Sequence, residues 1–210
     1  MMTTIDPFGE LREALEAARH RRAAASRALA PKHKGGEWEE FHAAIEAELI
    51  AERALAAAQQ EPYASPIEFP TLWDAGSPRP HLLQSEYRTF LVFFPEDPVT
   101  HQLAVVEFKR CISTLMGTPN DEVLEGHSLH GKGLQAYRPM RVENSRWLTE
   151  LERINSVHDQ YAPERWRNLS HYLFGFHDST FECVAESVAV ELHQRSLPEV
   201  LAEVCKRLVE

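Results

Sequence analysis

Titratable side chains are concentrated in one short segment, residues 171–187, which reads HYLFGFHDSTFECVAES. In an extended chain its alternating aromatic residues point to one side and its two histidines to the other. Asp178 and the Ser-Thr pair that follows it are typical of a turn, because such side chains bond nearby backbone N–H groups. Two interpretations remain open: a hairpin whose tip is HDST, or one strand that continues straight to Cys183.

In both interpretations His177 lies close to a carboxylate; the straight strand would also put Asp178, Thr180 and Glu182 in one polar row. A neighbouring carboxylate sets the tautomer of an imidazole and prepares it for proton transfer. Gly175 favours the same function, since a glycine in a strand lets a ligand come close to the backbone. We therefore predict His177, Asp178 and Glu182 as catalytic residues. The structural alternative is a His–Asp hydrogen bond that only stabilises a turn.

A second group of reactive side chains lies in the glycine-rich segment 117–134, GTPNDEVLEGHSLHGKGL. On a helical turn His127 and His130 face the same side, and with Asp121, or alternatively Glu122, they form a candidate metal site. Histidine ligands with one carboxylate suit Zn or Fe better than Ca. Lys132, between two glycines, is predicted to meet an anion and is a fourth catalytic candidate. The alternative is a polar surface loop whose glycines take positive φ.

Two distinct segments precede the part of the chain that carries these residues. Residues 1–60 predict a helical hairpin: Asp6 caps an alanine-rich helix, PKHKGG breaks it, and a second helix begins near Glu37. Because two helices alone bury little surface, we expect this hairpin to dock on the same chain or to form a homodimer. Residues 61–85 contain five prolines and predict an extended connector.

Residues 86–210 predict an α+β domain. Short connections and few crossover helices favour a mainly antiparallel sheet of about five strands, with helices on one face. Ser196 and Glu199 have the spacing of a capping box, which predicts a final helix. The other expected elements are strands at 86–94, 102–116 and 136–143, a helix after residue 144, a helical turn at 162–169, and two paired strands within 171–192.

Composition narrows the classes of function. The chain has 32 acidic and 22 basic residues and a formal charge of −10, without the basic cluster that nucleic-acid binding needs. No apolar run approaches the roughly 20 residues that span a membrane, and the N-terminus lacks the pattern of a signal peptide. Three widely spaced cysteines favour a reduced, cytoplasmic protein. Acyl-transfer, dinucleotide and zinc-ribbon motifs are also missing.

Two hypotheses about function remain. The first is a small cytoplasmic enzyme or small-molecule-binding protein with a pocket lined by His, Asp and Glu, metal-dependent in one version. The second is an acidic interaction protein, such as an inhibitor, an immunity-type partner or a regulator, which masks a basic protein through electrostatic steering. The density of histidines beside carboxylates favours the first hypothesis, while the charge of −10 favours the second.

Overall fold

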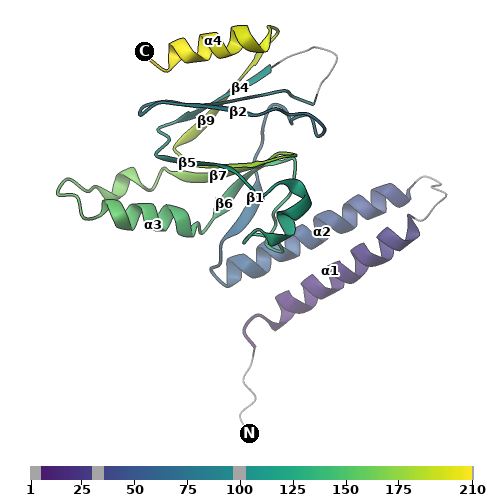
Figure 1. The fold of residues 1–210 in the computed structure, drawn as a ribbon. Coiled ribbons are helices and arrows are strands. Elements are labelled where there is room, and N and C mark those ends of the chain that lie inside the picture. The colour runs from purple at the N-terminus through teal and green to yellow at the C-terminus, as the bar shows by residue number, and fades with distance from the viewer. Residues whose placement is uncertain (1–5, 30–35, 97–102, 210) are drawn as a thin grey trace. The chain divides into compact units, whose positions relative to one another are not determined.

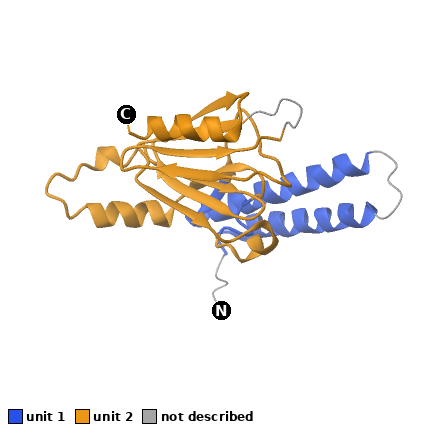
Figure 2. Cartoon of the chain, turned by 45° about the horizontal axis from the view of Figure 1, so that its top comes forward, with its two compact units in different colours: residues 1–64, 129–134 blue, residues 65–128, 135–210 orange. Residues whose placement is uncertain are grey.

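The computed structural model describes residues 6–29, 36–96 and 103–209. The chain forms two compact units (Figure 2): residues 1–64 with 129–134, and residues 65–128 with 135–210. The predicted break PKHKGG, apart from its last glycine, lies outside the described residues, as does the start of the strand expected at 102.

The first unit contains the predicted helical hairpin, α1 (Gly9–Ala28) and α2 (Glu37–Ala58) (Figure 1). The Asp6 carboxylate accepts a hydrogen bond from the Phe8 N–H (3.0 Å) just before α1. The N-cap residue is Phe8 and has no side-chain cap, so the predicted capping of α1 by Asp6 is wrong. Three glutamates occupy the first turn of α2, where the helix dipole favours negative charge. The helices bury few large side chains against each other, and Glu48 and Glu52 are buried on α2.

The strands of the chain form two antiparallel sheets, so the predicted α+β class is confirmed. One sheet has five strands, in the order β1 (Tyr63–Pro66), β6 (Pro139–Glu143), β7 (Ser170–Gly175), β8 (Thr180–Ala185) and β5 (Ser113–Gly117). The other has four, in the order β2 (His81–Gln84), β3 (Thr89–Phe93), β4 (Leu103–Lys109) and β9 (Ser187–His193).

An aromatic core joins the two sheets face to face. Phe108 of β4 lies 5.1 Å from Phe181 of β8 and 5.6 Å from Phe174 of β7, measured between ring centroids. Trp73 of the proline-rich connector enters the same core, 4.7 Å from Phe176. Each such ring removes a large apolar area from water, which is the main favourable term in folding. This packing explains why alternate residues of β7 are aromatic.

Helices cover the outer faces of this sandwich. Val200 and Val204 of α4 (Leu197–Arg207) pack on the outer side of the four-stranded sheet. On the five-stranded sheet, Trp147 of α3 (Arg146–Asn155) meets His171 at 5.0 Å. The capping box predicted at the start of α4 is present. No helix within the described ranges is long and apolar enough to cross a membrane.

The structure has more strands than predicted in two segments of the chain. The strand expected at 102–116 is β4 followed by β5, which lie in different sheets, and Arg110 between them has a φ of 48°. The pair expected within 171–192 is the hairpin β7–β8 followed by β9, which crosses to the other sheet. The hairpin interpretation of HDST is thus confirmed, and the single straight strand to Cys183 is wrong.

Candidate functional site

His177 lies in the tight turn between β7 and β8. The turn is closed by a hydrogen bond from the Phe176 N–H to the Ser179 carbonyl (2.8 Å). Just before it, the Gly175 carbonyl accepts from the Tyr137 N–H (3.0 Å) and from the indole N–H of Trp73 (3.1 Å). These hydrogen bonds connect the end of β7 to the core and to the segment that carries Tyr137. They therefore fix the backbone next to His177.

Asp121 reaches His177 from the loop before β6. It begins the short helix η1 (Asp121–Gly126), and its N–H donates to the His177 carbonyl (3.1 Å). Its carboxylate Oδ2 lies 3.0 Å from His177 Nδ1 and also accepts from the Tyr137 hydroxyl. The hydroxyl itself lies 3.2 Å from the same imidazole nitrogen. We call these three residues the Asp121–His177–Tyr137 cluster.

The charge of Asp121 sets the protonation states of the cluster. Hydrogen bonds from Tyr137 and then His177 lower the pKa of Asp121. Burial and the neighbouring carboxylate raise the pKa of Tyr137 to about 12. The hydrogen bond to Asp121 and its charge raise the pKa of His177, with smaller effects from Asp178 and Glu122. At neutral pH Asp121 is therefore ionised and Tyr137 is a donor.

This geometry leaves one nitrogen of the imidazole available. Because Asp121 is an ionised acceptor, Nδ1 of His177 carries the proton, and Nε2 of the neutral ring bears the lone pair. The His177 side chain is 41 % exposed, and Asp178 Oδ1 lies 4.0 Å from Nε2. The second oxygen of Asp121, Oδ1, is buried and has no hydrogen-bond partner in the described part of the chain. The cluster thus presents an oriented base to solvent.

A second cluster surrounds Glu182 on β8, on the outer face of the five-stranded sheet. His171 Nε2 lies 2.8 Å from Oε2 of Glu182, and His127 Nε2 lies 3.7 Å from Oε1. Burial alone raises the pKa of this carboxyl, but the hydrogen bonds from His127 and His171 outweigh it and lower the pKa to about 2. Glu182 therefore remains ionised between two imidazoles.

Ser145 completes a chain of hydrogen bonds through His171. Its hydroxyl lies 2.8 Å from His171 Nδ1, so the order is serine, histidine, glutamate. However, both Ser145 and His171 are only 6 % exposed, and the same hydroxyl caps α3 by accepting from the Leu148 N–H (3.1 Å). A hydroxyl that is buried and already used as a helix cap is poorly placed to attack a substrate. These contacts fasten α3 to the sheet.

The structure regroups the residues predicted as catalytic. His177 has a carboxylate partner as expected, but the contact at hydrogen-bond distance is with Asp121, and the side chain of Asp178 is 89 % exposed. Glu182 pairs with His171 and His127. Lys132 belongs to the first unit, where its ammonium lies 2.6 Å from Glu61.

The predicted metal ligands are also distributed differently. Asp121 belongs to the cluster with His177, and His127 to the cluster with Glu182, while His130 is an exposed residue of the first unit. Within the described residues, no three His, Cys, Asp or Glu side chains are grouped to hold a metal ion. The Zn or Fe site stays a prediction.

Sequence reasoning missed Tyr137. In the sequence it stands between Ala136 and Arg138, two residues before Pro139, with no histidine or carboxylate beside it. In the structure it has a φ of 59°, which is unusual for an aromatic residue. This backbone conformation accompanies the hydrogen bond from its hydroxyl to Asp121.

Comparisons of the chain with protein-family models, with curated proteins and with solved structures found no match. Its function is therefore argued from the geometry and electrostatics of the two clusters. Of these, the Asp121–His177–Tyr137 cluster has the more accessible imidazole, since His177 is 41 % exposed and His171 only 6 %.

Proposed function

We propose that this protein is an enzyme that transfers protons on a small-molecule substrate, with His177 as its general acid–base group. The observation that carries the proposal is the hydrogen bond from His177 Nδ1 to the largely buried carboxylate of Asp121, 3.0 Å long, which leaves Nε2 toward solvent. An imidazole oriented by a carboxylate in this way accepts a proton at Nε2 and can return it later in the reaction. Substrate identity stays open.

The surroundings of His177 restrict the charge of that substrate. Asp121, Glu122 and Asp178 all act on the imidazole with negative charge. An anionic substrate would be repelled by these carboxylates, whereas a neutral or cationic one would not. Tyr137 keeps its proton at neutral pH because its pKa is about 12, and it supports the carboxylate as a hydrogen-bond donor. We therefore assign Asp121 and Tyr137 as positioning residues.

Hydrolysis of p-nitrophenyl acetate tests this proposal without knowledge of the natural substrate, because an accessible neutral imidazole cleaves this ester. We expect His177→Gln to reduce the protein-dependent rate by about tenfold or more. The matched control is His158→Gln, which removes another exposed histidine of the second unit. The wild-type rate should rise with pH to a midpoint above 6.5, the ordinary pKa of histidine, because Asp121 raises this pKa. Equal rates in the two variants would contradict the proposal.

A metal-dependent form of the enzyme would use the Zn or Fe predicted from His127, His130 and Asp121, although within the described residues no three His, Cys, Asp or Glu side chains are grouped to hold a metal ion. It has less support than proton transfer alone, because Asp121 and His127 each contact another ionisable side chain. Metal analysis of the purified protein and titration with Zn and Fe(II), repeated with His130→Ala, test it. Stoichiometric metal that is lost in this variant would support the metal-dependent form.

The alternative function is an acidic interaction protein, and one observation favours it. The edge strand β5 and the residue before it expose Ile112 (45 %), Leu115 (55 %) and Met116 (38 %) without a charged residue between them. An uncharged edge of this kind suits pairing with an extended segment of another protein. Affinity capture with wild-type protein and Leu115→Lys, at low and high salt, tests this function. A partner retained equally by both proteins would count against β5 as the binding surface.

We also propose that the protein forms a homodimer and is located in the cytoplasm. A homodimer through the helical hairpin is supported by two exposed apolar side chains on α2, Trp38 (46 %) and Ile50 (55 %). Sedimentation of the wild type and of Ile50→Glu tests it. A reducing, cytoplasmic location is supported by three cysteines that are all free.

A further inference from the structure

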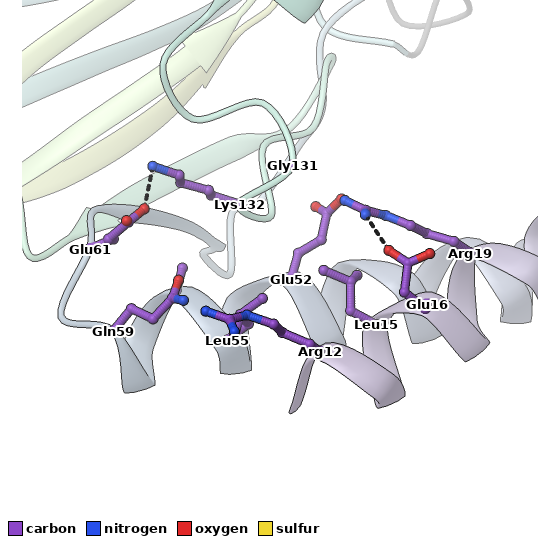
Figure 3. A pocket seen from close by; sticks show the side chains of 11 residues that line it. Arg12, Leu15, Glu16, Arg19, Glu52, Leu55, Gln59, Glu61, Gly131 and Lys132 are labelled. Atoms are coloured by element: carbon purple, nitrogen blue, oxygen red, sulfur yellow. Dashed lines mark hydrogen bonds and ion pairs between the residues drawn. The ribbon is translucent and has the colours of Figure 1, made fainter. Parts of the chain in front are cut away.

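The first unit contains a cavity of about 400 Å³ between α1, α2 and the segment at 131–132. Figure 3 shows the side chains that line it, with α1 on one side, α2 below and Lys132 on the other. Leu15 and Leu55 supply apolar surface, and charged side chains supply most of the rest. Cavities of this volume are in the range that holds small-molecule ligands.

The cavity has a buried acidic group. Glu52 is 8 % exposed, and its Oε2 accepts from the Gly133 N–H (3.0 Å). The other oxygen, Oε1, belongs to the same cavity lining. It faces Gly131, where an added Cβ would lie 4.0 Å from this oxygen and meet no other atom within that distance. A largely buried carboxylate in a cavity wall favours a positively charged partner.

The cavity also has cationic groups that a ligand can engage. Lys132 pairs with Glu61 (2.6 Å) and Arg19 with Glu16 (2.8 Å), and all four side chains are at least 30 % exposed. Exposed ion pairs of this kind contribute little stability, so the ammonium of Lys132 can turn to a ligand at low cost. Arg19 also lies 3.9 Å from the buried carboxylate of Glu48. Arg12 is 52 % exposed and pairs with Asp6, which does not line the cavity.

The cavity is lined by equal numbers of cationic and anionic side chains. Arg12, Arg19 and Lys132 are matched by three carboxylates, those of Glu16, Glu52 and Glu61. A simple anion or a simple cation would meet as many repulsive as attractive groups. A ligand with both charges, separated by an apolar body, meets attractive groups at both ends.

We propose that this cavity binds a small zwitterion of about dipeptide size, with its ammonium at Glu52 and its carboxylate at Arg12. The apolar body of the ligand then lies on Leu15 and Leu55. This site belongs entirely to the first unit, and the proposal does not depend on proton transfer by His177.

Isothermal titration calorimetry of the full chain with L-leucyl-L-leucine tests the site. The matched ligands are N-acetyl-leucyl-leucine, which lacks the ammonium, and leucyl-leucine amide, which lacks the carboxylate. We expect each to bind about tenfold or more weakly than the dipeptide, since each loses one charge-assisted hydrogen bond. Glu52→Gln should weaken dipeptide binding to a similar extent, because glutamine keeps an acceptor for the Gly133 N–H but removes the charge.

Arg12→Gln provides a second, exposed position, and Glu13→Gln on the same helix, outside the cavity lining, is the matched control. Arg12→Gln is expected to weaken binding of the dipeptide and to leave that of its amide unchanged. Glu13→Gln should bind both as the wild type does. Absence of binding at about 10 mM dipeptide, above the weakest affinity expected for a specific ligand, would overturn the proposal. Equal binding of the dipeptide and its acetylated form would also overturn it.

Discussion

Glu182→Gln is the substitution whose effect on stability can be worked most fully from the structure. The carboxylate is 19 % exposed and lies between His171 and His127. Burial by itself raises its pKa, but the two histidines lower it from the ordinary 4.5 to about 2. A carboxyl with a lowered pKa in the folded state stabilises that state when it is ionised.

The size and sign of the effect follow from the two pKa values. A change from 4.5 to about 2 corresponds to about 3 kcal/mol of folding free energy at neutral pH. This contribution is complete above the unfolded pKa of about 4.5 and disappears as the pH falls through about 2. At pH 3 about 2 kcal/mol of it should already be lost. Glutamine cannot ionise, so Glu182→Gln should lack this part of the pH dependence.

Urea denaturation at pH 7, 5 and 3, followed by tryptophan fluorescence, measures the effect. We expect Glu182→Gln to be about 3 kcal/mol less stable than the wild type at pH 7, and the difference to shrink to about 1 kcal/mol at pH 3. Glu164→Gln, at an exposed position, is the control. A wild-type-like stability of Glu182→Gln at pH 7, or a difference that does not depend on pH, would refute the reasoning.

Three further predictions concern individual side chains. Ser145→Ala should lower the stability to urea by about 1 to 2 kcal/mol, because it removes the cap of α3; an unchanged midpoint would contradict this. Gly133→Ala should lower the melting temperature, since its Cβ would lie 2.5 Å from backbone and side-chain atoms at a φ of 84°; Gly126→Ala, with open space around it, should not. Cys111, whose pKa falls to about 7 through a hydrogen bond with Cys183, should react with iodoacetamide at a rate that rises through neutral pH, whereas the buried Cys183 should stay unmodified, as peptide mass mapping would show.

The helices could be predicted from the sequence because their signals are local. Asp6 and the glutamates after Gly36 mark the starts of α1 and α2, and Ser196 with Glu199 marks the start of α4. The hairpin β7–β8 could also be predicted from the sequence, because Asp178 and its neighbours favour a turn. These features depend on residues only a few positions apart, so a short stretch of sequence contains their signal.

The division into two sheets could not be predicted in this way. Apolar residues run through β4 and β5 alike, and the change of sheet depends on a single left-handed residue, Arg110. Arginine has no preference for that conformation, so its type does not indicate a turn. The two sheets are selected by the aromatic core between them, which involves side chains distant in the sequence.

The candidate site was predicted in its residues and not in its pairings. The sequence indicates His177, Asp121 and Glu182, but it groups Asp121 with His127 because these two are close in the chain. In the structure Asp121 meets a histidine 56 residues away, at the far end of the sheet hairpin. Such a contact depends on where the loop before β6 crosses the end of β7, and nothing in the local sequence reports that.

The most direct test of the central claim is the tautomer and pKa of His177, measured from its ring ¹⁵N chemical shifts during a pH titration. We expect a proton on Nδ1 in the neutral ring and a pKa above 6.5, which falls when Asp121→Asn removes the carboxylate. A proton on Nε2, or a pKa that is the same in the wild type and in Asp121→Asn, would contradict this claim.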